Sequence, residues 1–153
     1  MKENFRWKTH GREVAMPDKV LIDTSIWVEF FRKKDSAISK KLQEYLKLNQ
    51  VYYSGPIFVE LYQGAKTQRD IEVFNQLFDT IHYVDITQKH YHHAGMVSQK
   101  AAREGKIFST IDVVLAVLAH DEGLSLFSLD RHFQDICHYC PLNLIPQLSE
   151  KFL

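Results

Sequence analysis

Four acidic residues in distant parts of the chain have the neighbours expected of residues in a metal-dependent catalytic site. Asp23 directly follows the apolar run Val-Leu-Ile, and Asp130 lies two residues after Ser128, at the end of another apolar run. Glu60 and Asp112 each lie in the first two turns of a segment with helical apolar spacing. If these carboxylates converge, their like charges need protons, cationic side chains or a divalent metal. Oxygen ligands with open positions suit Mg²⁺ or Mn²⁺, which points to metal-assisted phosphodiester hydrolysis.

Each of the four acids also has a structural explanation that involves no catalysis. Asp112 could form a capping box with Ser109, Asp130 could be a turn residue, and Glu60 could be an exposed helix residue. Asp23 is the hardest to explain in this way. A carboxylate directly after a buried strand is costly unless it is solvated, paired or bound to metal.

Other catalytic motifs are missing from the sequence, which has no His-x-x-x-His, no phosphate-binding G-x-x-x-x-G-K-[ST] loop and no G-x-S-x-G elbow. Cys137 and Cys140 form a C-x-x-C, but no second pair of zinc ligands accompanies them. We therefore expect these cysteines to have a structural or incidental role. Two unpaired cysteines suit a reducing compartment, so we expect a cytoplasmic protein.

The composition excludes several classes of protein. In 153 residues, 19 Lys and Arg balance 19 Asp and Glu, so the net charge is zero and argues against broad nucleic-acid affinity. A hydrophobic fraction of 45% excludes a disordered chain. Setting the four acids aside leaves an excess of positive charge on the rest of the chain. A neutral total is thus compatible with an anionic site in a mildly cationic body.

Short apolar runs alternate with helical patterns along most of the chain, which is typical of an α/β fold. We predict a three-layer α/β/α fold whose central layer is a mainly parallel sheet of about five short strands. Thr24 and Ser25 are suitable N-cap residues for the first helix. The expected strands cover residues 20–23, 51–53, 81–84, 124–128 and 142–145.

The predicted fold gives the four acids a common location. Open α/β sheets bind ligands beyond the carboxyl ends of their strands. Asp23 and Asp130 follow strands directly, and helices that come after strands begin at the same edge. We therefore expect all four acids to meet in one pocket.

Domain organisation is simple in this prediction. Residues 1–15 form an N-terminal extension, expected to be flexible, and residues 16–153 form a single domain. The extension has no apolar core of the kind found in secretory signals. No membrane span is predicted, because the longest apolar stretch without charge covers only residues 113–119.

Several remaining features suggest structural roles. Trp27 belongs to an apolar helix expected to lie in the core and at a dimer surface. His90, His92 and His93 are expected on a solvated helix face, because no carboxylate lies near them in the sequence. The basic residues between positions 32 and 47 are expected to form a solvated face, with RNA contact as the alternative.

The ordered set of four acidic segments resembles the PIN-domain ribonucleases, and most closely the VapC-like toxins of bacterial toxin–antitoxin pairs. No single segment is specific, but their order and spacing together are. The resemblance extends from about residue 19 to residue 145 and implies a PIN-like fold. The matching segments are residues 20–27, 59–64, 111–116 and 128–133.

This resemblance implies a catalytic site and partners. The implied catalytic residues are Asp23, Glu60, Asp112 and Asp130, of which Asp23, Asp112 and Asp130 would bind Mg²⁺ or Mn²⁺. Supporting roles are expected for Thr24, Ser25 and Ser128. The implied reaction is endonucleolytic cleavage of an RNA substrate, and the implied assembly is a homodimer that binds a cognate antitoxin protein.

Two alternatives within the same fold stay open at this point. One is a PIN nuclease that works without an antitoxin in RNA processing, and the other is a catalytically silent PIN binding module. The presence of all four acids weighs against the second. A receiver-like or phosphatase-like domain is disfavoured, because no Asp-x-Asp follows the first strand.

Overall fold

The protein was examined as a computed structural model. The structure describes the backbone of residues 6–9, 12–15 and 18–147, and the side chains of residues 18–147. Its central sheet has four strands, all parallel, in the order β5-β4-β3-β6. This confirms the predicted α/β fold with a parallel sheet. The strands are β3 (Val20–Ile22), β4 (Val51–Tyr53), β5 (His82–Tyr83) and β6 (Ser125–Phe127).

The strand count is lower than the predicted five, because residues 142–145 form only an isolated bridge. Leu126 of β6 pairs with Leu144 in parallel. The Leu126 N–H donates to the Asn143 carbonyl at 2.8 Å, and the Leu126 carbonyl accepts the Ile145 N–H at 2.9 Å. Beyond Ile145, the carbonyl of Ser128 accepts the side-chain amide of Gln147 at 2.9 Å in place of a backbone N–H. The pairing therefore ends after a single residue.

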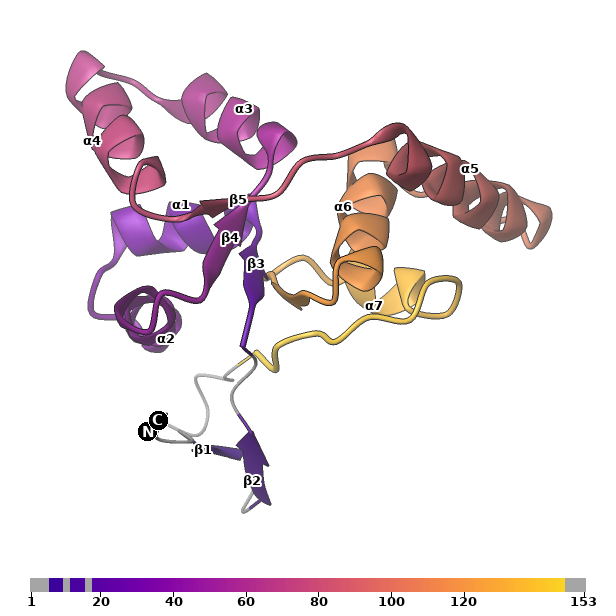
Figure 1. Cartoon of the computed structure of the whole chain (residues 1–153), viewed down its shortest axis with the longest axis horizontal. Helices are drawn as coiled ribbons and strands as arrows, with labels where there is room; N and C mark the ends of the chain where they lie inside the picture. Colours follow the sequence, from indigo (N-terminus) through magenta and orange to yellow (C-terminus); the bar gives the residue numbers. More distant parts are fainter. Residues whose placement is uncertain (1–5, 10–11, 16–17, 148–153) are drawn as a thin grey trace.

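Helices cover both faces of this sheet and form two groups (Figure 1). The first four pack around one another on one side, and the last three lie on the other side. Helix α7 was not predicted from the sequence. The first group is α1 (Thr24–Arg32), α2 (Ala37–Lys47), α3 (Gly55–Gly64) and α4 (Gln68–Phe78). The second group is α5 (Gln88–Arg103), α6 (Thr110–Asp121) and α7 (His132–Ile136).

Local sequence signals explain where several helices begin. Thr67 and Asp70 form a capping box at the start of α4, with both reciprocal hydrogen bonds present. Pro56 lies in the first turn of α3, where its missing N–H leaves no helix hydrogen bond unmade. Helix α1 differs from expectation, because its N-cap is Asp23 and the Asp23 side chain makes no capping bond.

The core is centred on β3 and α6. All three residues of β3 have no exposed surface, and residues 113–119 of α6 are all buried. Trp27 is likewise fully buried and meets the Phe78 ring edge-on, with 5.6 Å between centroids. This confirms the core position expected of Trp27. A strand and a helix buried on all sides hold the residues at their ends in fixed positions.

The first 15 residues contain a separate two-stranded antiparallel sheet. Its strands are β1 (Arg6–Thr9) and β2 (Arg12–Ala15). Residues 1–5 and 10–11 lie outside the described residues, so the flexibility expected of the extension stays a prediction. Among the described residues, no helix is long and apolar enough to cross a membrane.

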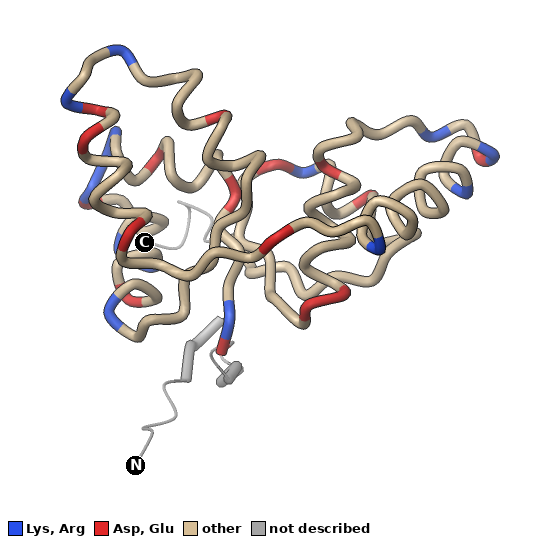
Figure 2. The backbone as a smooth tube through the Cα atoms, turned by 45° about the horizontal axis from the view of Figure 1, so that its top comes forward, with Lys and Arg blue, Asp and Glu red and all other residues tan. Residues whose placement is uncertain are grey.

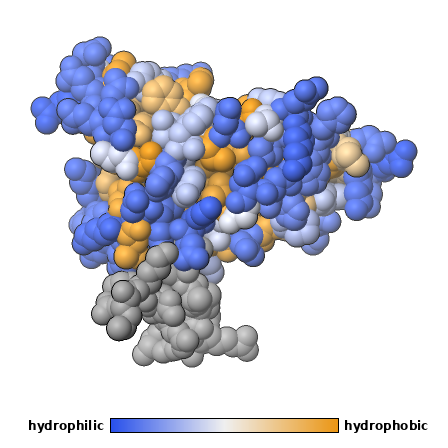
Figure 3. All heavy atoms as spheres, in the orientation of Figure 1, coloured by the Kyte–Doolittle hydropathy of each residue, from blue (hydrophilic) through white to orange (hydrophobic). Residues whose placement is uncertain are grey.

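Charged and apolar residues are distributed unevenly over the molecule. Lys and Arg gather toward the outer ends of the two helical groups, whereas several acidic residues lie near the middle (Figure 2). The face shown in Figure 3 is mostly hydrophilic over α5 and over the tip of α4, with apolar residues visible nearer the centre. Acidic residues thus lie near the centre of the molecule as well as on its outer helices.

Candidate active site

Asp23 lies at the carboxyl end of β3 and has 8% of its surface exposed. Its Oδ2 accepts hydrogen bonds from the hydroxyls of Ser25 at 2.8 Å and Ser128 at 2.7 Å. Its backbone N–H bonds the carbonyl of Phe127 at 2.9 Å, which continues the pairing of β3 with β6. Two hydroxyl donors and a fixed backbone hold this carboxylate in one orientation.

The same two serines position the loop that follows β6. The backbone N–H of Leu129 donates to Ser25 Oγ at 2.9 Å, and that of Asp130 donates to Ser128 Oγ at 3.0 Å. Each hydroxyl therefore links the Asp23 carboxylate to the segment carrying Asp130. The predicted supporting residues Ser25 and Ser128 lie where they can orient both acids.

Glu60 approaches from α3, on the other side of Asp23 along the sheet edge. The Thr24 hydroxyl donates to Glu60 Oε2 at 2.7 Å. Thr24 is the first residue of α1, so this bond connects the start of α1 to the second turn of α3. The Glu60 side chain remains exposed to solvent, as a residue that contacts substrate or water would be.

Asp112 lies in the first turn of α6, where only half of a capping box forms. The Asp112 N–H donates to Ser109 Oγ at 3.4 Å, but no reciprocal bond from the Asp112 carboxylate is present. Burial, followed by the negative charges of Asp130, Asp23 and Glu60, raises the pKa of Asp112 to about 6, while nearby His132 lowers it. The charges of all three other predicted acids therefore act on Asp112.

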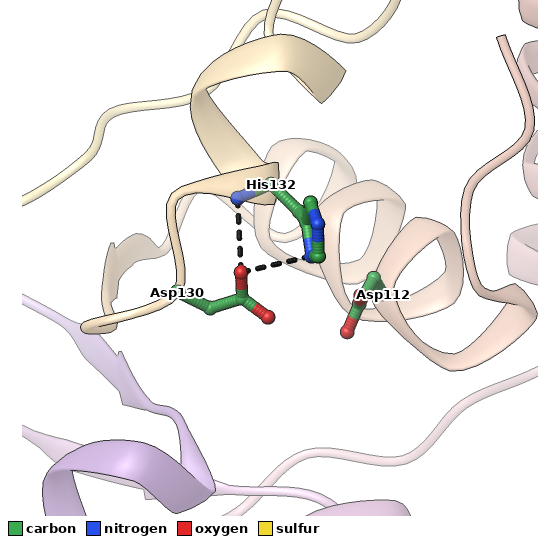
Figure 4. A group of neighbouring side chains, drawn as sticks. All are labelled: Asp112, Asp130 and His132. Atoms are coloured by element: carbon green, nitrogen blue, oxygen red, sulfur yellow. Dashed lines mark hydrogen bonds and ion pairs between the residues drawn. The ribbon is translucent and has the colours of Figure 1, made fainter.

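His132 is the residue of this site that sequence reasoning missed. Its imidazole lies close to two of the predicted acids (Figure 4). Three potential ligand atoms lie within 4.8 Å of one another, one each from Asp112, Asp130 and His132. This is the one such group of three or more within residues 18–147. Asp23 and Glu60 lie outside this compact group. The available signal was the position of His132 two residues after Asp130, in the fourth acidic segment.

The donor set suits a divalent cation. Carboxylate oxygens are the ligands that Mg²⁺ and Mn²⁺ prefer, and Asp112 and Asp130 present them from two different elements. Repulsion among the acids disfavours the charged form of Asp112, and a cation would relieve that repulsion. The arrangement could polarise a phosphate and activate water once the charge is balanced.

The two cysteines lie apart from this chemistry. Cys140 is buried and Cys137 partly buried, and both are free thiols. Burial raises the pKa of Cys137, and burial with the charge of Asp121 raises that of Cys140 to about 11. A thiol with a raised pKa is a poor nucleophile. A structural role is therefore supported for both.

The histidines of α5 are less solvated than the sequence suggested. His90 is 2% exposed, and its Nε2 lies 2.8 Å from Glu122 Oε1 at the end of α6. His93 Nδ1 lies 2.9 Å from Asp121 Oδ1. The prediction of a solvated face is wrong for His90, because its carboxylate partner is adjacent in space although distant in sequence. These pairs join α5 to α6.

Similarity to known proteins is clear at the level of family and fold. A family model described as the PIN domain matches residues 20–139. The curated protein "Ribonuclease VapC2" of Haemophilus influenzae is 25% identical over 123 residues, covering 77% of this chain and 92% of that protein.

Solved structures share the fold at lower sequence identity. A DNA-bound VapBC structure from Salmonella typhimurium superposes with a TM-score of 0.70 and 19% identity, covering 85% of this chain and 98% of that one. VapBC2 from Rickettsia felis, bound to a promoter DNA fragment, gives a TM-score of 0.68 and 20% identity. The match covers 82% of this chain and 96% of the Rickettsia chain.

Proposed function

The chain belongs to the PIN domain family, and from that membership we propose that it is a divalent-metal-dependent endoribonuclease acting as the toxin of a toxin–antitoxin pair. A ribonuclease activity is supported by the curated relative named "Ribonuclease VapC2". A toxin–antitoxin context is supported by the two VapBC structures that share the fold. The cytoplasm, where cellular RNA is accessible, is the proposed place of action.

One observation carries the catalytic part of this proposal. The charges of Asp23, Glu60 and Asp130 act together with burial to raise the pKa of Asp112. Structural ion-pair networks bring opposite charges together, whereas this site gathers four like charges from four segments of the chain. Carboxylates concentrated in this way are typical of a site that functions with a bound cation.

The proposed metal ligands are Asp23, Asp112 and Asp130, and the proposed ion is Mg²⁺ or Mn²⁺. When bound, the cation supplies Lewis-acid chemistry by neutralising the phosphate charge and lowering the pKa of the attacking water. Ser25 and Ser128 hold Asp23 in place by hydrogen bonding. Glu60, which is exposed and accepts a hydrogen bond from Thr24, is the proposed acceptor of a proton from water.

The reaction that these residues support is hydrolysis of an RNA phosphodiester. Water attacks the phosphorus in line with the leaving 3′ oxygen, so the products carry a 5′-phosphate and a 3′-hydroxyl. Protein groups position the phosphate and take up the proton of the water, and the leaving 3′ oxygen gains a proton from solvent to become the hydroxyl. The proposed partners are the RNA substrate, a cognate antitoxin protein and a second copy of this chain in a homodimer.

The test is to map the 5′ ends of RNA after the purified protein acts on it with Mg²⁺. We expect defined 5′-phosphate ends, loss of cleavage in excess EDTA, and recovery with Mg²⁺ or Mn²⁺. Asp23→Asn should lower cleavage by at least about 100-fold, because even an outer partner of a metal ligand costs 10–100-fold when removed.

The matched control is Asp35→Asn, which makes the same change at an exposed acid between α1 and α2. It should cleave like the parent protein. Full cleavage by Asp23→Asn, or cleavage that persists in EDTA, would contradict the proposed site. A folded protein that cleaves nothing in any condition would indicate a silent binding module.

A further inference from the structure

We propose that His132 is a nitrogen ligand of the cation in this site, and that it makes the site prefer a transition metal such as Mn²⁺ to Mg²⁺. The inference rests on the proposed metal dependence and extends it. The predicted ligands contain oxygen only, and oxygen-only sites discriminate poorly between these two ions. One imidazole nitrogen changes that, because Mg²⁺ binds nitrogen weakly and first-row transition metals bind imidazole well.

The first observation is the position of the imidazole. His132 Nδ1 lies 3.0 Å from Asp130 Oδ1. His132 and Asp130 also share a compact arrangement with Asp112, in which one ligand atom from each lies within 4.8 Å of the others. Figure 4 shows the imidazole between the carboxylates of Asp130 and Asp112, with a dashed line joining it to Asp130.

The spacing of these atoms suits a shared ion. Mn²⁺ and Mg²⁺ favour octahedral coordination, and ligand distances of about 2.1 Å place neighbouring ligand atoms roughly 3.0 Å apart. The distance between Nδ1 and Oδ1 is 3.0 Å. The two atoms therefore have the separation of adjacent ligands of one ion before any rearrangement.

The backbone of His132 is held firmly although its side chain is exposed. Its N–H donates to Asp130 Oδ1 at 2.9 Å. Phe133 and Ile136 anchor α7 in the core, with 1% and 0% exposure. An imidazole on an anchored backbone, with its ring open to solvent, can reach an ion without displacing packed side chains.

Charge gives a further reason for a histidine at this position. The carboxylates of Asp112 and Asp130, with ligand atoms within 4.8 Å of each other, already repel one another. Another carboxylate ligand would increase that repulsion, whereas a neutral imidazole adds a donor atom and no negative charge. His132 thus completes the ligand set with less electrostatic cost than an additional acid.

A competing role for His132 is purely positional. In that role its Nδ1–H donates to Asp130 and orients the carboxylate, and no bond forms between nitrogen and metal. The two roles differ in a directly measurable property, which is the presence of a nitrogen nucleus in the coordination sphere. Cleavage activity alone does not separate them.

The experiment is pulsed electron paramagnetic resonance on the full-length protein loaded with Mn²⁺ alone, without RNA. We expect a ¹⁴N coupling of directly bound imidazole, and we expect His132→Gln to abolish it while Mn²⁺ still binds. His92→Gln, at an exposed histidine of α5, is the matched control and should keep the coupling. Calorimetry should show Mn²⁺ affinity reduced about 10-fold in His132→Gln and Mg²⁺ affinity reduced less.

Outcomes separate this inference from the proposed function. Bound Mn²⁺ without ¹⁴N coupling in the parent protein, or with a coupling that survives in His132→Gln, would overturn the role of His132 and leave the carboxylate site standing. Absence of any specific Mn²⁺ binding would overturn both. His132→Ala provides a second variant, because it removes the hydrogen bond to Asp130 as well as the nitrogen.

Discussion

The Ser128 hydroxyl donates a 2.7 Å hydrogen bond to Asp23 Oδ2, across 105 residues of sequence. The same hydroxyl oxygen accepts the backbone N–H of Asp130 at 3.0 Å. Ser128 is 6% exposed and directly follows β6, whose pairing with β3 places it beside Asp23. One small side chain therefore connects two of the proposed metal ligands, and the geometry of the site depends on it.

Removing this hydroxyl should impair cleavage more than folding. Ser128→Ala leaves Asp23 with the Ser25 hydroxyl as a donor, so we expect the free energy of unfolding to fall by only about 1–2 kcal/mol. Cleavage should fall roughly 10- to 100-fold, as for other residues that orient metal ligands. Ser128→Thr keeps the hydroxyl and should retain most activity. Equal cleavage rates for Ser128→Ala and the parent protein would refute the orienting role.

The raised pKa of Asp112 predicts how stability depends on pH when metal is absent. Its pKa is about 6 in the folded protein against an ordinary 3.8, so the folded state binds the proton more tightly than the unfolded chain. The contribution of Asp112 is therefore fully present below about pH 4 and lost as the pH rises through about 6. Thermal melts in EDTA at several pH values should show this loss.

Asp112→Asn is the variant that isolates this effect. The neutral amide cannot ionise, so the variant should melt higher than the parent protein at about pH 7.5 in EDTA. It should also lose most of the stabilisation that Mg²⁺ gives the parent protein. Identical melting curves for the two proteins across this pH range would show that Asp112 is not repelled by its neighbours.

The pair formed by His90 and Glu122 should matter for stability and not for cleavage. His90 Nδ1 accepts the Thr87 N–H at 2.9 Å, and its Nε2 meets Glu122 at 2.8 Å. His90→Leu leaves those groups without a partner and should lower the free energy of unfolding by about 2–3 kcal/mol in urea titrations. His92→Leu, at its exposed neighbour, should change it by less than about 0.5 kcal/mol. A large loss of cleavage in folded His90→Leu would assign this histidine a different role.

Deleting residues 1–15 should leave the catalytic domain intact. The four-stranded sheet and the proposed site are built from residues 20–132, and β1 pairs with β2 in a sheet of their own. The melting temperature of the deletion variant should change by less than about 2 °C, or under roughly 1 kcal/mol. RNA cleavage should also be unchanged. A substantial drop in the melting temperature or in RNA cleavage would show that residues 1–15 contribute to the domain.

Local signals in the sequence were sufficient for most of the fold. The apolar run at 51–53 forms β4 with the predicted bounds, and a local Thr67–Asp70 capping box begins α4. Helix α7 was missed because its five residues are too few to show helical periodicity. The predicted fifth strand forms only one bridge, because the Gln147 side-chain amide bonds the Ser128 carbonyl where a backbone N–H would continue the pairing. Whether such a short helix or strand forms depends on its tertiary contacts more than on its own sequence.

The sequence by itself determined that Asp23, Glu60, Asp112 and Asp130 lie at or near the ends of elements that share one edge of a parallel sheet. Tertiary structure alone decided the contacts among them. A ligand atom of His132, at the start of α7, lies within 4.8 Å of one of Asp112 in α6, and Ser128, just after β6, donates to the Asp23 carboxylate. Such contacts join residues far apart in the chain, so they follow from how helices and strands pack and leave no local pattern to read.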